Sequence, residues 1–303
     1  MSVILSDPEI EQERTDTFAL VSQTVTDADF ALFQRLIEKK TGIYLAPIKK
    51  TLLIGRLSRR LRDLGLPSLR KYYKRVLTDP AEHTHMVDCI STNETHFFRE
   101  PLHFEFLERQ IFPQWIAEAN AGARPRRIRV WSAACSTGEE PYSIAMTLLH
   151  HFPQSSGWHI EILATDISTR VLARARAGIW PVEKSAQIPE TYLKSFMLRG
   201  TGESEGKMKA GIEIQRAIRF EHLNLLEEPT ASRAVPFDMI FCRNVLIYFQ
   251  PETKIQVVRR LLGRLAPDGY LFVGHSESLN HLTDCVRSIV PTVYIQTTAS
   301  KGR

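Results

Sequence analysis

From Ile128 onward, short apolar runs alternate with amphipathic segments, and few folds accommodate that order. The apolar runs have the length of buried strands, and the segments between them repeat their apolar residues at helical spacing. Such alternation is typical of parallel βαβ units with right-handed crossovers and helices on both faces of the sheet. We therefore predict an α/β domain with strands over residues 128–134, 160–165, 238–242 and 270–274, helices over 141–150, 168–177 and 252–265, and a last strand within 288–297, antiparallel at the sheet edge.

The residues before this domain follow a different pattern. Residues 1–25 are polar without sustained periodicity, which predicts a flexible tail. Thr26 and Asp29 match a capping box, and Phe30 and Phe33 begin an apolar stripe at helical spacing. Further stripes of this kind follow, so we expect residues 26–92 to form a small all-helical domain.

Two more segments complete the predicted organisation. Residues 93–127 are interpreted as a bridging segment and a linker, because the stretch from Ala119 to Arg127 is rich in Ala, Arg, Gly and Pro. Residues 178–216 interrupt the α/β alternation with a polar, turn-rich stretch that glycines punctuate. We assign this stretch to a small β insertion, either a hairpin or a three-stranded ribbon, within a domain that spans residues 128–298.

Composition narrows the class of protein. Hydrophobic residues make up 43% of the chain and charged residues 24%, as in an ordinary globular protein. No apolar run has the length needed to cross a bilayer and the first residues lack a signal pattern, so we expect a cytoplasmic protein without membrane insertion. The four cysteines are far apart without a CxxC pair, which predicts free thiols and no zinc site. The net charge of +5 suits a nucleic-acid binder, a membrane-surface protein or an enzyme that acts on acidic protein.

The loop after the first predicted strand could approach a ligand closely. It reads Ser132-Ala-Ala-Cys-Ser-Thr-Gly-Glu-Glu-Pro141, in which Gly138 permits a tight turn. Glu139 and Glu140 lie beside the turn, where they could meet a cationic ligand group. The loop lacks the full GxGxxG of a dinucleotide site, and an ordinary strand-to-helix turn is the alternative.

Polar residues also follow two other predicted strands. Doubly wound sheets bind ligands outside the carboxyl ends of their strands. Asp166 ends the second strand, where it either accepts hydrogen bonds from ribose hydroxyls or caps the next helix. Arg243 and Asn244 follow the strand over 238–242, and a structural asparagine at a strand end is the alternative there. Three strand ends with polar residues predict one crevice.

The stretch from Ser91 to Glu100 mixes hydrogen-bonding groups, aromatic residues and an arginine. A metal site built from His96 and His103 lacks convincing partners. We interpret the stretch as a lid or bridging segment over the crevice.

Five segments of the chain are Ser91-Thr-Asn-Glu-Thr-His-Phe-Phe-Arg-Glu100, Val130-Trp-Ser-Ala-Ala-Cys-Ser-Thr-Gly-Glu-Glu-Pro-Tyr-Ser143, Ala164-Thr-Asp166, Phe241-Cys-Arg-Asn-Val-Leu-Ile-Tyr-Phe249 and Gly274-His-Ser-Glu277. Taken together, these segments resemble the chemotaxis receptor glutamate methyltransferases, which use S-adenosylmethionine. The resemblance extends from about Phe30 to Tyr294. It implies a helical N-terminal domain, a Rossmann-like methyltransferase domain with a mixed seven-stranded sheet, and a small β insertion.

The resemblance also implies the site residues and the reaction. The enzyme would transfer a methyl group to receptor glutamates and release S-adenosylhomocysteine. Arg99, Arg243 and Tyr248 would hold the acceptor carboxylate or shape its pocket. Ala134 and Ser136 stand where methyltransferase loops commonly have glycine, a departure that is typical of this family. The cofactor-binding residues would be Asn93, Thr95, Arg99, Glu139 or Glu140, Asp166, Asn224, Leu225, Arg243 and Asn244.

Two surfaces are expected to bind the cytoplasmic domain of a receptor. Arg56, Arg59 and Arg62 lie on the flank and back of the predicted helix over 51–64 and would dock on an acidic face of the receptor, with a solvated helix face as the alternative. Arg199 to Gly206 resembles the longer β-loop of family members that bind a receptor's C-terminal peptide, with an inert insertion as the alternative. We expect a monomer that binds no nucleic acid.

Two other functions stay open. An amino-methylating nucleic-acid enzyme would resemble sequences with Asp or Asn before Pro-Pro and an aromatic residue, and this chain has no such run. A cytosine C5 enzyme needs a nucleophilic cysteine, usually after proline, whereas Cys242 follows Phe241. The second alternative is a catalytically silent binding module that keeps the fold.

Overall fold

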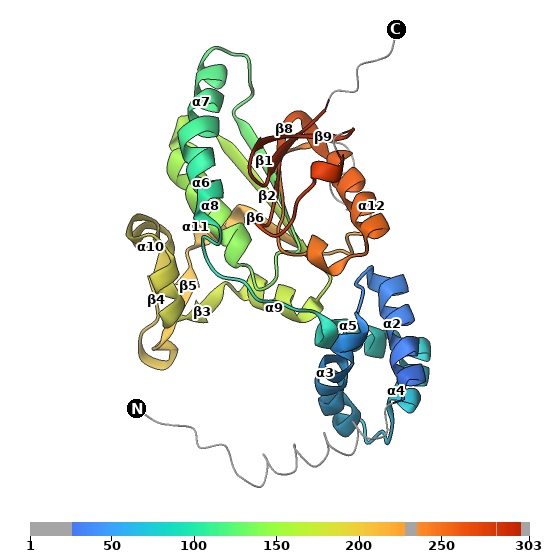
Figure 1. Cartoon of the computed structure of the whole chain (residues 1–303). Helices are drawn as coiled ribbons and strands as arrows, with labels where there is room; N and C mark the ends of the chain where they lie inside the picture. Colours follow the sequence, from blue (N-terminus) through green and yellow to red (C-terminus); the bar gives the residue numbers. More distant parts are fainter. Residues whose placement is uncertain (1–25, 228–234, 283, 298–303) are drawn as a thin grey trace. The chain divides into compact units, whose positions relative to one another are not determined.

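The structure, a computed structural model, describes residues 26–227, 235–282 and 284–297 (Figure 1). The predicted tail over residues 1–25 lies outside the described residues. The chain divides between Thr92 and Asn93 into two units. Among the described residues, no helix combines the length and the apolar character that crossing a membrane requires.

The first unit is all-helical, which confirms the prediction from apolar spacing. Thr26 begins the first helix with a capping box to Asp29, and Gly42 ends it with a left-handed backbone, φ 77°. The cap supplies acceptors for amides that have no partner within the helix. Phe33 and Tyr72 are fully buried at the centre of the unit. Its helices are α2 (Asp27–Thr41), η1 (Pro47–Lys49), α3 (Lys50–Asp63), α4 (Leu69–Thr78) and α5 (Pro80–Ile90).

The second unit is built on a seven-stranded sheet with the order β6-β2-β1-β7-β8-β10-β9. The first five strands in this order run parallel, whereas β10 pairs antiparallel with both β8 and β9. The mixed Rossmann-like sheet is therefore confirmed. Its strands are β1 (Arg127–Ala133), β2 (His159–Asp166), β6 (Ile218–His222), β7 (Phe237–Cys242), β8 (Leu265–Val273), β9 (Val286–Val290) and β10 (Val293–Gln296).

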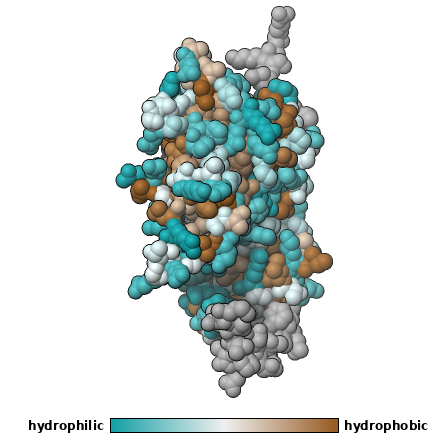
Figure 2. Space-filling view, turned by 90° about the vertical axis from the view of Figure 1, so that its left-hand side faces the viewer, coloured by the Kyte–Doolittle hydropathy of each residue, from teal (hydrophilic) through white to brown (hydrophobic). Residues whose placement is uncertain are grey.

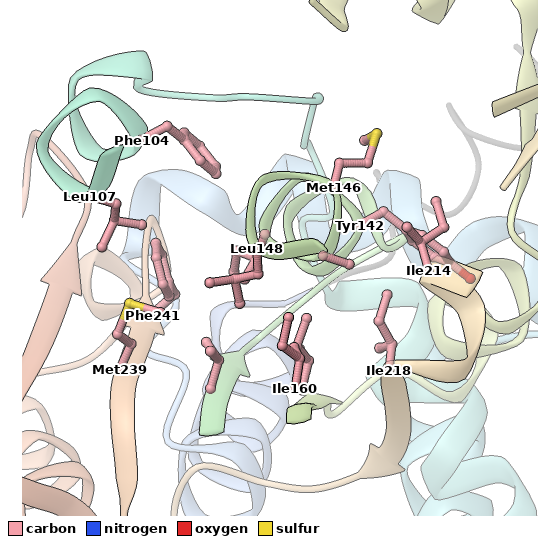
Figure 3. Packing of buried hydrophobic residues seen from close by; sticks show 14 of the residues in the cluster. Phe104, Leu107, Tyr142, Met146, Leu148, Ile160, Ile214, Ile218, Met239 and Phe241 are labelled. Carbon is pink, nitrogen blue, oxygen red and sulfur yellow. The ribbon is translucent and has the colours of Figure 1, made fainter. Parts of the chain in front are cut away.

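Helices cover both faces of this sheet (Figure 1). On one face, α8 directs Leu148 toward the strands, near Ile160 of β2 and Phe241 of β7 (Figure 3). On the other face, α12 packs Val257 and Leu261 into a second buried cluster. The helices outside the insertion are α6 (Pro101–Phe106), η2 (Leu107–Ile111), α7 (Phe112–Asn120), α8 (Glu139–His151), η3 (Gln154–Ser156), α9 (Thr169–Ala177), η7 (Leu246–Tyr248), α12 (Pro251–Leu262) and η8 (Asn280–Leu282).

Residues 93–127 hold more structure than the bridge and linker that the sequence suggested. The helices α6, η2 and α7 occupy residues 101–120 without a break. Phe104, Leu107, Ile111 and Trp115 recur at helical spacing and are buried in the same cluster as the sheet residues. Burial of this apolar stripe makes the segment part of the second unit.

The β insertion contains the three-stranded antiparallel sheet β3-β5-β4. Its exposed apolar residues include Ile179, which is 45% exposed, and Leu198, which is 59% exposed. The face of the whole molecule drawn in Figure 2 is mostly hydrophilic, with small, separate hydrophobic areas. The insertion elements are β3 (Ile179–Pro181), η4 (Val182–Gln187), α10 (Glu190–Phe196), β4 (Met197–Arg199), η5 (Gly202–Ser204), β5 (Lys207–Ala210) and α11 (Ile212–Arg216).

Candidate active site

The loops that carry the motif segments follow neighbouring strands. β1 pairs with β2 at Ala133 and Thr165, and with β7 at Ser132 and Phe241. The chain thus continues from β1 to β2 on one side and returns to β7 on the other. Such a reversal of strand order opens a crevice at the carboxyl edge, where α/β sheets bind ligands.

The loop after β1 has an unusual backbone. Ala134, Ser136 and Gly138 have φ angles of 68°, 50° and 98°. A Cβ added at Gly138 would lie 3.0 Å from the Cβ of Ala175, so both space and backbone require glycine there. Non-glycine residues with positive φ are uncommon and cluster at functional sites. The loop therefore reaches a strained, close-fitting conformation although it has fewer glycines than a dinucleotide site.

Asp166 holds this loop and also the residue that caps α9. Its Oδ2 accepts a hydrogen bond from the Ser136 N–H at 2.9 Å, and its Oδ1 accepts one from the Ser168 N–H at 2.9 Å. The Ser168 hydroxyl in turn accepts from the Val171 N–H at 3.4 Å in the first turn of α9.

A buried ion-pair network lies beside the loop. The Arg243 side chain is 1% exposed and lies 3.1 Å from the Glu100 carboxylate and 3.2 Å from the Glu140 carboxylate. It also donates to the Arg99 carbonyl oxygen. The Ser132 hydroxyl donates to Glu140 at 2.7 Å. Arg243 therefore connects the bridging segment to the first turn of α8.

The two carboxylates of this network differ in their pKa. Burial raises the pKa of Glu140, and the nearby Arg243 and Ser132 only partly offset it. Burial also acts on Glu100, but Arg243 and the His275 N–H outweigh it and hold the pKa of Glu100 below its usual value. Because an added positive charge favours the ionised form, Glu140 is the carboxylate that would gain more from a cationic ligand group.

Glu139 and Glu140 face different surroundings, which bears on a choice that the sequence left open. The Glu139 side chain is 0% exposed and ion-pairs with Lys184 of the β insertion. It also accepts a hydrogen bond from the Thr137 hydroxyl at 2.6 Å. Glu140 instead faces Ser132 and the Arg243 network. The geometry favours Glu140 as the carboxylate that meets a ligand.

Glu277 fixes the loops after β7 and β8. Its carboxylate accepts from the N–H groups of Asn244 at 2.7 Å, Gly274 at 2.6 Å and Ile247 at 3.3 Å. Asn244 has a positive φ of 59°, and its side-chain amide donates to Glu100 at 3.3 Å. A Cβ added at Gly274 would lie 2.5 Å from the Asn244 side chain, so glycine is needed there.

The bridging segment joins the loop after β1 from the other side. The Asn93 carbonyl oxygen accepts from the Ser136 hydroxyl at 2.9 Å. Thr95 and Arg99 are partly exposed, and Arg99 donates to the Glu94 carbonyl oxygen at 3.2 Å. The hydrogen bonds of Ser136 and of Arg243 thus connect this segment to the loops after β1 and β7.

Three further predicted residues follow β6 and β7. The Leu223 N–H donates to the Asp166 carbonyl oxygen at 3.0 Å, which places the next residues, Asn224 and Leu225, beside the end of β2. Asn224 is 9% exposed and Leu225 is 8% exposed. Tyr248 is the last residue of η7 and is partly exposed.

The predicted docking arginines lie on α3 of the first unit and differ in their surroundings. Arg56 is partly buried and donates to the Ile90 carbonyl oxygen and, at 2.9 Å, to the Thr92 hydroxyl. It thereby stabilises the end of α5, which makes it the least suited of the three to docking. Arg59 and Arg62 are exposed.

Sequence reasoning missed several residues of this site. Glu100, Glu277 and Ser132 lie within the quoted segments, but no role was assigned to them. Glu100 precedes α6 without capping it through its side chain, and Glu277 lies in the loop after β8, so no local signal marks either carboxylate. Lys184 lies outside the quoted segments. Within the described ranges, no group of three or more His, Cys, Asp or Glu residues has metal-binding geometry.

Comparison with known proteins gives consistent results for both units. Residues 28–91 match the family described as "CheR methyltransferase, all-alpha domain", and residues 93–295 match "CheR methyltransferase, SAM binding domain". The chain is 42% identical over 273 residues to Chemotaxis protein methyltransferase 2 of Pseudomonas aeruginosa, which covers 89% of this chain and 93% of that relative. It is 40% identical over 263 residues to the Chemotaxis protein methyltransferase of Escherichia coli, with 85% and 87% covered. The chain belongs to the CheR methyltransferase family.

Proposed function

We propose that this chain transfers a methyl group from S-adenosylmethionine to glutamate carboxylates of methyl-accepting chemotaxis receptors. The products would be glutamate methyl esters and S-adenosylhomocysteine. One observation carries the proposal: hydrogen bonds connect all five motif segments at one edge of the sheet. Ser136 donates to Asn93 and to Asp166. Arg243 donates to Glu100 and to Glu140. The Asn244 N–H donates to Glu277, and the His275 N–H donates to Glu100.

The residues at this edge fit S-adenosylmethionine. The small, left-handed residues from Ala134 to Gly138 let backbone come close to a ligand. Asp166 would hold the ribose, with Asn224 and Leu225 beside the adenine. Glu140 would meet the cationic methionine part, and Asn93, Thr95, Arg99 and Asn244 would complete the pocket. When bound, S-adenosylmethionine supplies an electrophilic methyl group on a sulfonium.

The protein needs to orient the glutamate acceptor and the methyl donor, and it does not need a general base. A glutamate with a pKa of about 4.3 is already an anion at pH 7. Alignment of the reactants and exclusion of water would then provide most of the acceleration. Because Arg243 is paired with two carboxylates, its proposed role is to shape the pocket. Arg99 and Tyr248 are proposed to contact the acceptor.

The proposed reaction is tested by incubating the protein with methyl-labelled S-adenosylmethionine and a receptor cytoplasmic fragment. Label should enter the receptor and leave it as volatile methanol in mild alkali, because esters hydrolyse under these conditions. Alkali-stable label on nucleic acid would instead support the nucleic-acid methyltransferase. Binding of S-adenosylhomocysteine without any transfer would support a silent module.

The pH dependence of cofactor binding follows from the raised pKa of Glu140. Below that pKa, a cationic ligand group must displace a proton before it pairs with the carboxylate, so affinity should fall as the pH falls. Titration calorimetry with S-adenosylhomocysteine between pH 8 and pH 5 should show weakening that begins above the pKa of an ordinary glutamate, about 4.3. Glu140→Gln should bind more weakly at pH 8 and lack this dependence. An unchanged pH profile in the variant would assign the dependence to another group.

Receptor docking is proposed to use Arg59 and Arg62. The double variant Arg59→Glu/Arg62→Glu should lower receptor methylation about tenfold or more at low salt, since charge reversal on a docking face acts mainly on association. Its affinity for S-adenosylhomocysteine should not change. The matched control is Arg127→Glu/Arg287→Glu, which reverses two exposed arginines on β1 and β9. Equal methylation by both double variants would contradict the docking role, and the exposed face of α3 would then be an ordinary solvated helix face.

A receptor's C-terminal peptide is proposed to add to the edge strand β4. The other edge strand, β3, contains Pro181, which has no N–H to offer. The Gly200 N–H bonds to the Lys207 carbonyl oxygen on β5, so by alternation the N–H of Arg199 points to the free edge. Exposed strand edges bind peptides through such groups.

Calorimetry with a receptor tail peptide tests this tether. Arg199→Pro removes the outward N–H and should reduce peptide binding more than Arg199→Ala, which removes only the side chain. Both variants should bind S-adenosylhomocysteine normally. No binding of the peptide to the wild-type chain, together with unaltered methylation of a receptor without its tail, would contradict the tether.

A further inference from the structure

One turn of the β insertion contacts both segments that frame the proposed cofactor pocket. From η4, Lys184 ion-pairs with Glu139, the first residue of α8. Three residues further on, the Gln187 side-chain oxygen accepts a hydrogen bond from the Phe97 N–H of the bridging segment at 3.1 Å. The insertion is therefore bonded to the start of α8 and to the bridging segment through side chains of a single short helix.

The ion pair fixes a carboxylate that has no access to solvent. The Glu139 side chain is 0% exposed, whereas that of Lys184 is 30% exposed. A buried carboxylate without a cation or hydrogen-bond donors is strongly unfavourable. Its other oxygen accepts from the Thr137 hydroxyl within the loop. Glu139 is thus held on one side by Lys184 of the insertion and on the other by Thr137 of the loop after β1.

Aromatic packing strengthens the same connection. Trp180 of β3 makes edge contacts with Phe97, at 5.0 Å between ring centroids, and with Tyr142 of α8, at 4.9 Å. A Cβ added at Gly178, where the insertion begins, would lie 2.9 Å from the Tyr142 hydroxyl oxygen. The start of the insertion is therefore packed closely on α8, which leaves little freedom between them.

Both contacted segments carry residues of the proposed pocket. Thr137 follows Ser136, whose N–H is held by Asp166, and Glu139 precedes Glu140. Phe97 lies midway between Thr95 and Arg99. A shift of Glu139 or of Phe97 would consequently move a neighbour that faces the ligand.

We propose that Lys184 and Gln187 are positioning residues through which the β insertion sets the geometry of the cofactor pocket. The inference rests on the proposed function for the identity of the cofactor. It gives the insertion a role in cofactor affinity that is separate from any binding of a receptor peptide.

The test uses the full chain and calorimetric binding of S-adenosylhomocysteine. Lys184→Met should weaken binding about tenfold, because binding groups must be held within about 0.5 Å of their productive positions. Lys184→Arg keeps the cation and should recover most of the affinity. Gln187→Leu should weaken binding, and Gln187→Glu, which keeps the acceptor for the Phe97 N–H, should recover it. In methylation assays, the KM for S-adenosylmethionine should rise with little change in kcat.

Lys209→Met is the matched control, because it removes a positive charge from the central strand of the same small sheet at an exposed position. It should bind like the wild type. The double variant Glu139→Gln/Lys184→Met has no unpaired buried charge, so it should regain thermal stability without regaining affinity.

Three outcomes decide between explanations. Equal affinity of Lys184→Met and Lys209→Met would overturn the positioning role. Recovery of affinity along with stability in the double variant would also overturn it, because Lys184 would then act only by neutralising a buried charge. If the wild-type chain bound no S-adenosylhomocysteine, the proposed function itself would be contradicted, and the positioning role would be contradicted with it. Partial unfolding would reduce the number of binding sites in the titration, which distinguishes it from a change in affinity.

Discussion

Arg243→Leu is expected to lower the free energy of unfolding of the second unit by about 3–5 kcal/mol, because removal of one partner from a buried ion pair leaves its counter-charges uncompensated. Glu100 and Glu140 would both lose their guanidinium, and the Arg99 carbonyl oxygen would lose its donor. The bridging segment would then lose its connection through Arg243 to the first turn of α8. We therefore also expect the loss of measurable S-adenosylhomocysteine binding.

Urea unfolding followed by tryptophan fluorescence measures this effect. All four tryptophans, at positions 115, 131, 158 and 180, lie in the second unit, so their fluorescence reports on that unit and not on the helical one. Arg109→Leu serves as the control, because its side chain is 77% exposed in an ion pair with Glu105. It should change stability by no more than about 0.5 kcal/mol. Similar unfolding midpoints for the two variants would show that the Arg243 network does not stabilise the second unit as expected.

Asp166→Ala is expected to weaken S-adenosylhomocysteine binding roughly 100-fold or more. Hydrogen bonds to a charged group contribute about 1.5–3 kcal/mol each, and this carboxylate holds the Ser136 amide besides its proposed contact with the ribose. Without it, the strained backbone of the loop after β1 loses the acceptor that keeps it in place. The loop would then relax toward conformations that do not fit the ligand.

Calorimetry on the wild type and three variants separates the contributions. Asp166→Asn keeps the size of the side chain and one acceptor oxygen, so it should bind more tightly than Asp166→Ala and less tightly than the wild type. Asp268→Ala removes a carboxylate that is 71% exposed and should leave binding unchanged. Wild-type affinity in Asp166→Ala would place the ribose elsewhere on the sheet edge.

Much of the local structure could be predicted because its causes lie within a few residues. The capping box of Thr26 and Asp29, the left-handed Gly42 and the Ser168 cap of α9 all involve neighbours in the chain. The period of apolar residues then distinguished strands from helices. The short strand β6 was not predicted, because it contains only two apolar residues, Ile218 and Phe220, and so short an alternation is a weak strand signal.

The amino-acid sequence alone determined the α/β class, the helical first unit, and the strand ends that carry Asp166, Arg243 and Asn244. Only the tertiary structure decided which of these groups meet. Arg243 pairs with Glu100 across 143 positions of the chain, a separation at which no local pattern operates. Glu139 and Glu140 are adjacent in sequence, yet successive side chains of a helix point about 100° apart. The rotation of α8 about its axis is set by its packing on the sheet, and that packing turns Glu139 toward the insertion and Glu140 toward Arg243.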